Sequence, residues 1–416
     1  MGSLELDILR SAMEGSAAAF RCRRRLQPAG GPGDKVFPPT FAGAVYAIEK
    51  RRVPGRVEPV TCVLLDSVQS QANRMELALQ EAVDAGRISL PLVVVDFSDH
   101  DPTGNLEADE AAGRLIEKVG KITSLQVPHR LADAILRDSE LNGTKFRRSE
   151  RGKALNTVRL ANATPLFELC PTALVFGMWD STGPKGGLGP KFERAIVSEI
   201  VGVGVEVGDL RRGVRRDPLE ISRDVLVFRD EDKSLLRVAE GGEKGAVRPS
   251  EINHSSVPFP EQRDRKTEAN YYDGVTIEYA EQTTTLSLIC LRRLRFPLNG
   301  KADSAVDLAA RMTLAALGLA AATLAFEAGT NLRSRCLLWP DGPMVWELLD
   351  RPGEDPRRFS LTGDAAVGLF KEAVKTALEK GLPWLAEPVV LKPSQELVKL
   401  VRLSQLEAAK EAVGVS

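Results

Sequence analysis

The chain has 416 residues, of which 43% are hydrophobic, and its formal net charge is −1. That length suffices for one large elaborated domain or for two or three ordinary ones. The near-zero charge excludes a uniformly basic protein, so any contact with nucleic acid has to come from local patches. The five cysteines lie far apart and form no Cys-x-x-Cys pair. This argues against a zinc ribbon or a disulfide framework and favours a reducing cytosol.

Signals for export or for a membrane are not visible in the sequence. The N-terminus carries acidic residues where a signal peptide is basic. The most apolar long stretch, residues 312–326, is shorter than the roughly 20 residues that cross a bilayer. The three scattered histidines argue against a His-rich metal site. We therefore expect a cytoplasmic protein with no membrane part, no metal and no cofactor.

The first part of the chain predicts strands that lead into a helix. Residues 21–39 are basic and too interrupted by Gly and Pro for a helix. Alternating or continuous apolar runs predict strands at 41–50, 59–66 and 89–97. A helix should run from Ser67 to about Ala85, with Asp66 or Ser67 as its N-cap. Its apolar stripe should face a sheet and consists of Val68, Ala72, Met75, Leu79 and Ala82.

The rest of the chain predicts more strands, one insertion and a helical end. A helical region is expected near 105–140, a strand at 171–180, and a helix at 192–200 after a Gly-rich loop. Residues 205–275 are charged and rich in loops, and we interpret them as an insertion with short strands. One or two strands are predicted within 274–296. Helices are predicted at 303–328, 364–381 and 394–413.

Two segments, "VLLDS" (63–67) and "GMWDS" (177–181), each read as a buried strand that ends in Asp-Ser before a helix. In a split βαβ sheet two such junctions open at the same edge, which would bring the segments together. The fold class expected is α+β, with an RRM-like (ferredoxin-like) palm. We expect a single elaborated domain, 1–416. Its parts would be a palm at about 40–97, 170–204 and 274–350, insertions at about 98–169 and 205–273, and C-terminal helices at 355–416.

The start of the first predicted helix carries hydroxyls, amides and one guanidinium, but no carboxylate. Such groups pair with phosphates, sugars and base edges, and Arg74 can hold a phosphate with two hydrogen bonds. The alternative is an ordinary exposed polar face of a helix. The candidate RNA-binding residues here are Ser67, Gln69, Ser70, Gln71, Asn73 and Arg74.

The Gly-rich loop "STGPKGGLGPK" (181–191) offers backbone N–H groups ahead of a predicted helix, an arrangement that binds phosphate. Lys185 and Lys191 add positive charge. The glycine spacing fits neither a Walker A loop nor a dinucleotide fingerprint. A flexible linker is the alternative interpretation.

Basic residues also gather in three further segments. Residues 144–153 surround Phe146 with cations, a pattern typical of single-strand binding, although a solvated charged loop explains it too. "RCRRR" (21–25) adds arginines that include Arg25, and "LRRLRF" (291–296) places more on a predicted strand. The candidates in the first of these segments are Lys145, Arg147 and Arg148.

Two enzymatic alternatives remain open at this point. "DFSDHD" (96–101) could hold a metal through Asp96, Asp99, His100 and Asp101, although a turn explains the same composition. His129 and Asp133 lie one helical turn apart without a visible nucleophile, and a surface pair explains them.

Seven ordered motifs together resemble a known family. They are "RLQPAGGPGDKVFPPTFAG", "LLDSVQSQANRME", "PHRLADAILRDS", "FGMWDSTGPKGGLGPKFERAIVSEI", "RPSEINHSSVP", "LSLICLRRLRF" and "LAALGL…NLRSRC". From about residue 20 to 350 the chain is similar to the RAMP-type backbone subunit of type I CRISPR effector (Cascade) complexes, and most similar to subtype I-G, formerly I-U.

The resemblance implies an RRM-like palm with thumb and finger insertions and a structural role. Copies of such a subunit polymerise along a guide RNA (crRNA) and present its bases to target DNA. The Ser/Gln-rich first helix of the family holds the guide's phosphates, and the Gly-rich loop is a second expected contact. This chain has Asn73 where many relatives have Lys. Residues 250–258 suggest a thumb or inter-subunit element, with no ligand role for His254.

We therefore expect a non-enzymatic guide-RNA-binding subunit of a CRISPR interference complex. The expected partners are the guide RNA, the target DNA strand, further copies of the chain, the cap or repeat-processing subunit, the large subunit, and a recruited helicase-nuclease. The alternative is a metal-dependent ribonuclease or a nucleotide hydrolase that uses the Asp-rich or Gly-rich loop, with Asp66 and Asp180 as further residues to test.

Overall fold

The structure is a computed structural model. It describes residues 2–42, 45–183, 186–207, 218–222, 224–229, 236–240, 244–249 and 274–413, without the side chains of residues 106 and 410–413. The chain divides into two units. The first comprises Met1–Asp99, Gly120–Val207 and Gly274–Leu397, and the second comprises His100–Val119, Gly208–Asp273 and Val398–Ser416.

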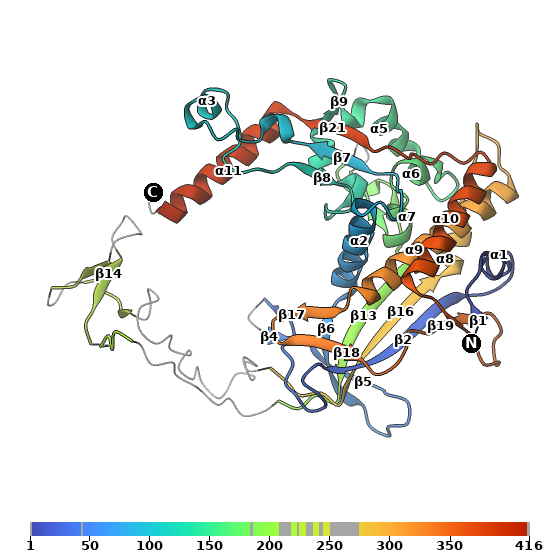
Figure 1. Cartoon of the computed structure of the whole chain (residues 1–416), viewed down its shortest axis with the longest axis horizontal. Helices are drawn as coiled ribbons and strands as arrows, with labels where there is room; N and C mark the ends of the chain where they lie inside the picture. Colours follow the sequence, from blue (N-terminus) through green and yellow to red (C-terminus); the bar gives the residue numbers. More distant parts are fainter. Residues whose placement is uncertain are drawn as a thin grey trace. The chain divides into compact units, whose positions relative to one another are not determined.

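The first unit is built on a ten-stranded sheet, drawn in Figure 1. All its pairings are antiparallel except that of β1 with β20. The strand order is β1 (Gly2–Ser3), β20 (Arg357–Ser360), β19 (Trp346–Leu349), β2 (Ala19–Pro28), β16 (Tyr279–Ser287), β13 (Ile196–Val203), β6 (Val60–Asp66) and β5 (Ile48–Arg51). Two more strands, β17 (Thr330–Arg333) and β18 (Cys336–Pro340), pair with each other, and β18 also pairs with β2.

Four of these strands have the ferredoxin-like arrangement. Strands β2 and β13 run parallel with β16 between them, and α2 (Val68–Asp84) lies between them in the chain. Strands β16 and β19 run parallel with β2 between them, and α9 (Ser304–Glu327) connects them. Each βαβ unit therefore straddles a strand of the other, as in a split βαβ fold. The α+β class is confirmed.

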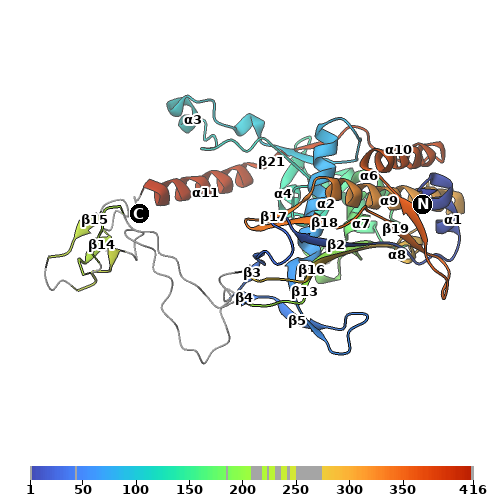
Figure 2. The same cartoon turned by 60° about the horizontal axis from the view of Figure 1, so that its bottom comes forward.

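Helices α2 and α9 lie on one face of this sheet, as Figures 1 and 2 show. Helix α2 packs on β13 and on α9, and α10 (Gly363–Glu379) packs on α9. By length and composition alone α9 could cross a membrane, but 83% of its most apolar 18-residue window is buried inside the protein. The Ala-rich surface of α9 lets its neighbours approach closely, and it forms the centre of the core.

A second sheet of the first unit joins distant segments. Its order is β10 (Thr144–Lys145), β9 (Ser139–Leu141), β21 (Val389–Pro393), β7 (Val93–Asp96) and β8 (Lys121–Thr123). Two short hairpins are separate: β3 (Thr40–Phe41) with β4 (Val45–Tyr46), and β11 (Met178–Trp179) with β12 (Lys191–Phe192). The remaining helices of this unit are α1 (Leu6–Glu14), α4 (Ala134–Arg137), α5 (Glu150–Ala154), α6 (Thr164–Leu169), α7 (Thr172–Phe176) and α8 (Leu288–Arg292).

The described residues of the second unit include helices and a two-stranded hairpin. Helix α3 (Leu106–Ala111) is capped by the side chain of Asn105, and β14 (Val227–Arg229) pairs with β15 (Leu236–Val238). Helix α11 (Gln395–Val413) begins in the first unit and continues in the second. Within the second unit, Gln405 of α11 accepts hydrogen bonds from the backbone N–H groups of Ile116 and Glu117. His254 and the motif at 250–258 lie outside the described residues.

The elements with strong local signals agree with the sequence predictions. Strand β6 and helix α2 are where they were predicted, and Ser67 is the N-cap, accepting a hydrogen bond from the N–H of Ser70. The three C-terminal helices are confirmed as well. The strand expected at 41–50 is divided among β3, β4 and β5.

Two neighbouring predictions were wrong, and with them the idea of paired strand junctions. Residues 172–176 form the buried helix α7, and only Met178–Trp179 are extended; a short continuous apolar run does not distinguish a buried strand from a buried helix. Residues 196–200, expected as part of a helix, belong to strand β13 (Ile196–Val203). The segment "GMWDS" therefore contributes no strand to the central sheet.

Smaller corrections concern two other segments. The region near 105–140 contains only short helical pieces and the strand β8, because its apolar residues lack a continuous helical period. The arginines of residues 291–296 lie at the end of α8 and in the loop after it, and not on a strand.

Candidate nucleic-acid interface

Two polar side chains near the start of α2, Gln71 and Arg74, hold the helix against the sheet and its neighbours. Gln71 is buried, its Nε2 donates to Asp66 Oδ2 at 2.6 Å, and its Oε1 accepts from Ser198 Oγ at 2.9 Å and Gln282 Nε2 at 2.8 Å. Asp66 is 1% exposed and also accepts from Arg74 Nε at 3.0 Å. These contacts tie three strands and the helix into one buried polar network.

Arg74 is engaged on several sides. Besides the bond to Asp66, its two terminal nitrogens donate to the carbonyl oxygens of Asn331 and Leu332 at 3.3 and 2.9 Å. Arg333 Nη2 lies 3.6 Å from the same Asp66 carboxylate. Of the six candidates in this segment, only Gln69 and Asn73 are exposed, while Ser67, Ser70 and Arg74 are half-buried.

Arg130, in the motif "PHRLADAILRDS", links α2 to the Gly-rich segment. Its Nε and Nη2 donate to the two carboxylate oxygens of Glu76 at 2.6 and 2.7 Å, and its Nη1 donates to the carbonyl oxygen of Gly177 at 3.0 Å. Residues 74 and 76 point about 200° apart around a helix. Gly177, which precedes β11, and the contacts of Arg74 are therefore attached to opposite sides of α2.

The Gly-rich loop closes a hairpin and does not precede a helix. Strands β11 and β12 pair Trp179 with Lys191, and the N–H of Asp180 donates to the carbonyl oxygen of Pro190. A Cβ at Gly189 would lie 1.9 Å from the carbonyl oxygen of Asp180, so only glycine fits there. Strand β12, and not the expected helix, follows the loop, so the helix N-terminus predicted there is not formed. Lys185 lies outside the described residues.

The hairpin presents an aromatic ring beside a cation. Trp179 is 51% exposed, and the Lys191 Nζ lies 5.4 Å from the centre of its ring. Leu188, at the tip of the loop, is 89% exposed. A base can stack on such a ring while the ammonium meets the backbone phosphate. Trp179 was not among the predicted candidates, although a Trp two residues before a Gly-rich, Lys-flanked loop was a usable signal.

An ion pair joins the hairpin to the predicted basic segment 144–153. Arg147 Nη2 lies 2.5 Å from Asp180 Oδ2, and the two side chains are 14% and 4% exposed. Arg147 belongs to the 3-10 helix η3 (Phe146–Arg148), and its neighbours Lys145 and Arg148 are exposed. The pair fixes η3 beside the start of the Gly-rich loop.

A hollow of about 240 Å³ surrounds this ion pair. Its lining comes from three motifs that are distant in the sequence: Leu131, Ala132, Arg137, Arg147, Asp180, Thr182 and Gly183. We call this hollow, together with the exposed side chains of Lys145, Arg148, Trp179 and Lys191, the hairpin surface.

The other basic candidates lie elsewhere in the first unit. Arg25 is exposed on β2, with its guanidinium 4.4 Å from the ring centre of Tyr279. Arg293 pairs with Glu193 at 3.0 Å, and Arg295 lies 3.4 Å from Asp307. None of these contacts involves a residue of the hairpin surface.

Two aspartates of the Asp-rich turn, Asp96 and Asp99, form ion pairs with Lys392. Lys392 Nζ lies 3.4 Å from Asp96 Oδ2 and 2.8 Å from Asp99 Oδ2. Hydrogen bonding from Ser98, and then the Lys392 ammonium, lower the pKa of Asp96. Asp101 accepts a hydrogen bond from the N–H of Val119. Within the described part of the chain, no group of three His, Cys, Asp or Glu side chains could hold a metal ion.

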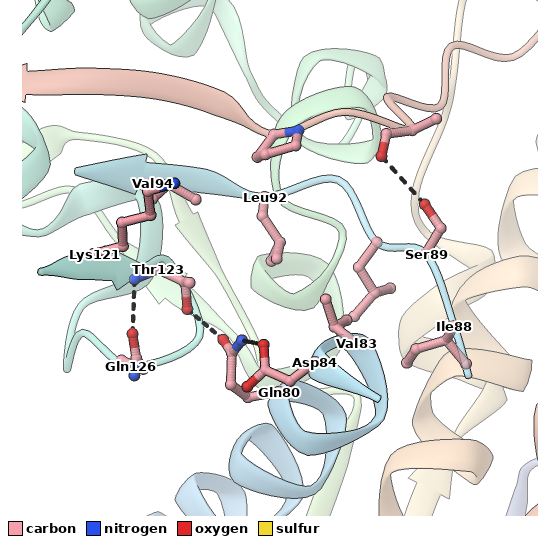
Figure 3. A pocket seen from close by; sticks show the side chains of 13 residues that line it. Gln80, Val83, Asp84, Ile88, Ser89, Leu92, Val94, Lys121, Thr123 and Gln126 are labelled. Atoms are coloured by element: carbon pink, nitrogen blue, oxygen red, sulfur yellow. Dashed lines mark hydrogen bonds between the residues drawn. The ribbon is translucent and has the colours of Figure 1, made fainter. Parts of the chain in front are cut away.

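Two further features weigh against catalytic assignments. Asp133 accepts from the backbone N–H of His129 and caps α4, which is a structural arrangement. A separate hollow of about 450 Å³ lies beside the C-terminal end of α2. Figure 3 shows that its polar side chains form hydrogen bonds with one another. Gln80 accepts from Thr123 Oγ1 at 2.6 Å and donates to Asp84 at 2.8 Å.

Fold and site together define an α+β protein of ferredoxin-like topology whose Gly-rich hairpin carries a basic and aromatic surface. Residues 20–207, somewhat less than half of the chain, match the model of the family described as CRISPR-associated protein GSU0053. The matched range contains every residue of the hairpin surface. The match supports a CRISPR-associated role for this chain. No curated protein matches it.

Proposed function

We propose that this chain is a guide-RNA-binding backbone subunit of a CRISPR interference complex, of the RAMP type and subtype I-G, and that it acts in the cytoplasm without enzymatic activity. The observation that carries the proposal is the convergence of three motifs on the hairpin surface. Arg147 and Asp180 hold these segments together, while Lys145, Arg148, Trp179 and Lys191 remain exposed.

The composition of the hairpin surface suits single-stranded RNA. Cations follow a sugar-phosphate backbone, and an exposed aromatic ring stacks on a base of any identity. Such a surface reads shape and charge and leaves the recognition of sequence to base pairing. The near-zero net charge of the chain allows many copies to lie side by side along one RNA.

The partners proposed for such a complex are further copies of the chain, the large and cap subunits, the target DNA strand and a recruited helicase-nuclease.

The residues at the start of α2 contribute less to RNA binding in this proposal than the sequence suggested. Gln69 and Asn73 remain exposed for contact with the guide, whereas Gln71 and Arg74 hold the fold.

RNA-binding measurements on the full chain test the proposal. Lys191→Ala and Arg148→Ala should each weaken binding to several unrelated single-stranded RNAs alike, and each should reduce the salt slope by about 0.7. Lys371→Ala, an exposed lysine on α10, is the matched control and should change neither quantity. Loss of binding to one RNA sequence only, or no binding to RNA by the unaltered chain, contradicts the proposal.

The enzymatic rival has its own test. Labelled RNA incubated with the purified protein and Mg²⁺ should remain intact. Asp66 and Asp180 are buried and paired with arginines, and Lys392 occupies the Asp-rich turn. Divalent-dependent cleavage that disappears in Asp96→Ala, Asp66→Ala or Asp180→Ala would establish a nuclease instead.

A further inference from the structure

The face of the central sheet opposite α2 and α9 carries a row of arginines. Side chains alternate along β2, so Cys22, Arg24 and Leu26 are buried while Arg21, Arg23 and Arg25 are half-buried or exposed on the other face. Residues two apart on a strand are about 7 Å apart. This spacing is comparable to that of successive phosphates in an extended single strand.

These arginines border a hollow of about 630 Å³. Five arginines and three acids line it, which leaves an excess of two positive charges. The charged residues of the lining are Arg21, Arg23, Arg24, Arg25, Arg358, Glu281, Glu347 and Asp355. Glu347 pairs with Arg21 at 2.8 Å, and Glu281 pairs with Arg23 at 2.7 Å. Partly exposed pairs of this kind contribute little to stability and can be exchanged for a stronger anion.

Arg24 is the most unusual member of this group. It is 8% exposed, and its Nε and Nη1 are buried without a hydrogen-bond acceptor. Its guanidinium lies 4.9 Å from the ring centre of Phe326, and none of the ion pairs among the described residues includes it. Burial lowers the pKa of Arg24. Its side chain points to the helix-covered face of β2 with Cys22 and Leu26, so Arg24 borders the hollow but is not part of the outward-facing row of Arg21, Arg23 and Arg25.

Two aromatic residues flank the arginine row. The Arg25 guanidinium lies over the Tyr279 ring, and a guanidinium held in this way offers its plane to a base. Trp339 of β18 is 72% exposed and is paired in register with Gln27 of β2, so it shares the face of Arg25 and lies diagonally across from it. Cations in a row beside exposed stacking groups are typical of single-strand binding.

We infer that this face of the sheet is a second binding surface for single-stranded RNA, with backbone phosphates on Arg21, Arg23 and Arg25 and a base against Trp339. The inference rests on the proposed function, because it adds a contact for the same RNA. The chain would then hold RNA at two places in the first unit, the hairpin surface and the arginine row.

The two exposed tryptophans allow the surfaces to be measured separately. Trp179→Phe leaves Trp339 as the most exposed tryptophan, and Trp339→Phe leaves Trp179. Single-stranded RNA should quench the fluorescence of both variants. In the Trp179→Phe background, Arg23→Ala/Arg25→Ala should abolish the quenching, weaken RNA binding roughly tenfold and lower the salt slope by about 1.4. The control Arg87→Ala/Arg351→Ala removes two ion-paired arginines that do not line the hollow and should have no effect.

The outcomes distinguish the two proposals. Two results together would overturn the second surface and leave the proposed function intact. RNA would quench the fluorescence of Trp339→Phe but not of Trp179→Phe, and Arg23→Ala/Arg25→Ala would bind RNA with unchanged affinity. Absence of RNA binding by the unaltered chain overturns both. Quenching in both tryptophan variants, with loss of the Trp339 signal in the double arginine variant, supports the inference.

Discussion

Arg147 Nη2 and Asp180 Oδ2 lie 2.5 Å apart in a nearly closed environment, although 33 residues separate them in the sequence. Arg147 also donates to Asn156 Oδ1 at 3.2 Å. The pair determines where the Gly-rich hairpin lies relative to the basic segment around Phe146. It is therefore a positioning contact for the hairpin surface and is not itself available to RNA.

Removing either member of this ion pair should lower the free energy of unfolding. Arg147→Ala leaves a buried carboxylate without its partner, and we expect the free energy of unfolding to fall by about 3–5 kcal/mol. Urea denaturation measures this change. The double variant Arg147→Met/Asp180→Val replaces both charges by apolar groups and should recover most of the loss. Equal destabilisation in the single and double variants would show that packing, and not the unpaired charge, dominates.

The polar network below α2 gives a second prediction. Gln71→Ala removes the partner of Asp66, Ser198 and Gln282 at once, and should lower the free energy of unfolding by about 2–3 kcal/mol. Asn73→Ala, an exposed amide on the same helix, should change it by less than about 0.5 kcal/mol. Comparable losses in the two variants would contradict the structural role given to Gln71.

A third prediction concerns pH at the Asp-rich turn. The pKa of Asp96 is lowered in the folded state, so its contribution to stability is present above the unfolded pKa and is lost as the pH falls through the folded value. Lys392→Met should raise the pKa of Asp96, while the hydrogen bonding from Ser98 keeps part of the shift. NMR titration of the Asp96 carboxyl measures this. Lys371→Met is the control, and an unchanged Asp96 titration in Lys392→Met would contradict the ion pair.

The sequence alone determined the elements whose signals are local. Helix α2 follows from its N-cap and apolar period, and α9 follows from a long Ala- and Leu-rich run capped by Asp303. The α+β class could also be predicted. These features depend on neighbours within one or two turns of chain, which a sequence displays directly.

Tertiary structure decided the remainder. Residues 172–176 and 196–203 could each form helix or strand by their own pattern, and the choice came from the sheet and core around them. The engagement of Gln71 and Arg74 inside the protein, the Arg147–Asp180 pair and the shared face of Arg25 and Trp339 are all contacts between distant segments. Whether a polar side chain binds a ligand or its own fold depends on which groups the folded chain brings within hydrogen-bonding distance, and the order of residues does not contain that distance.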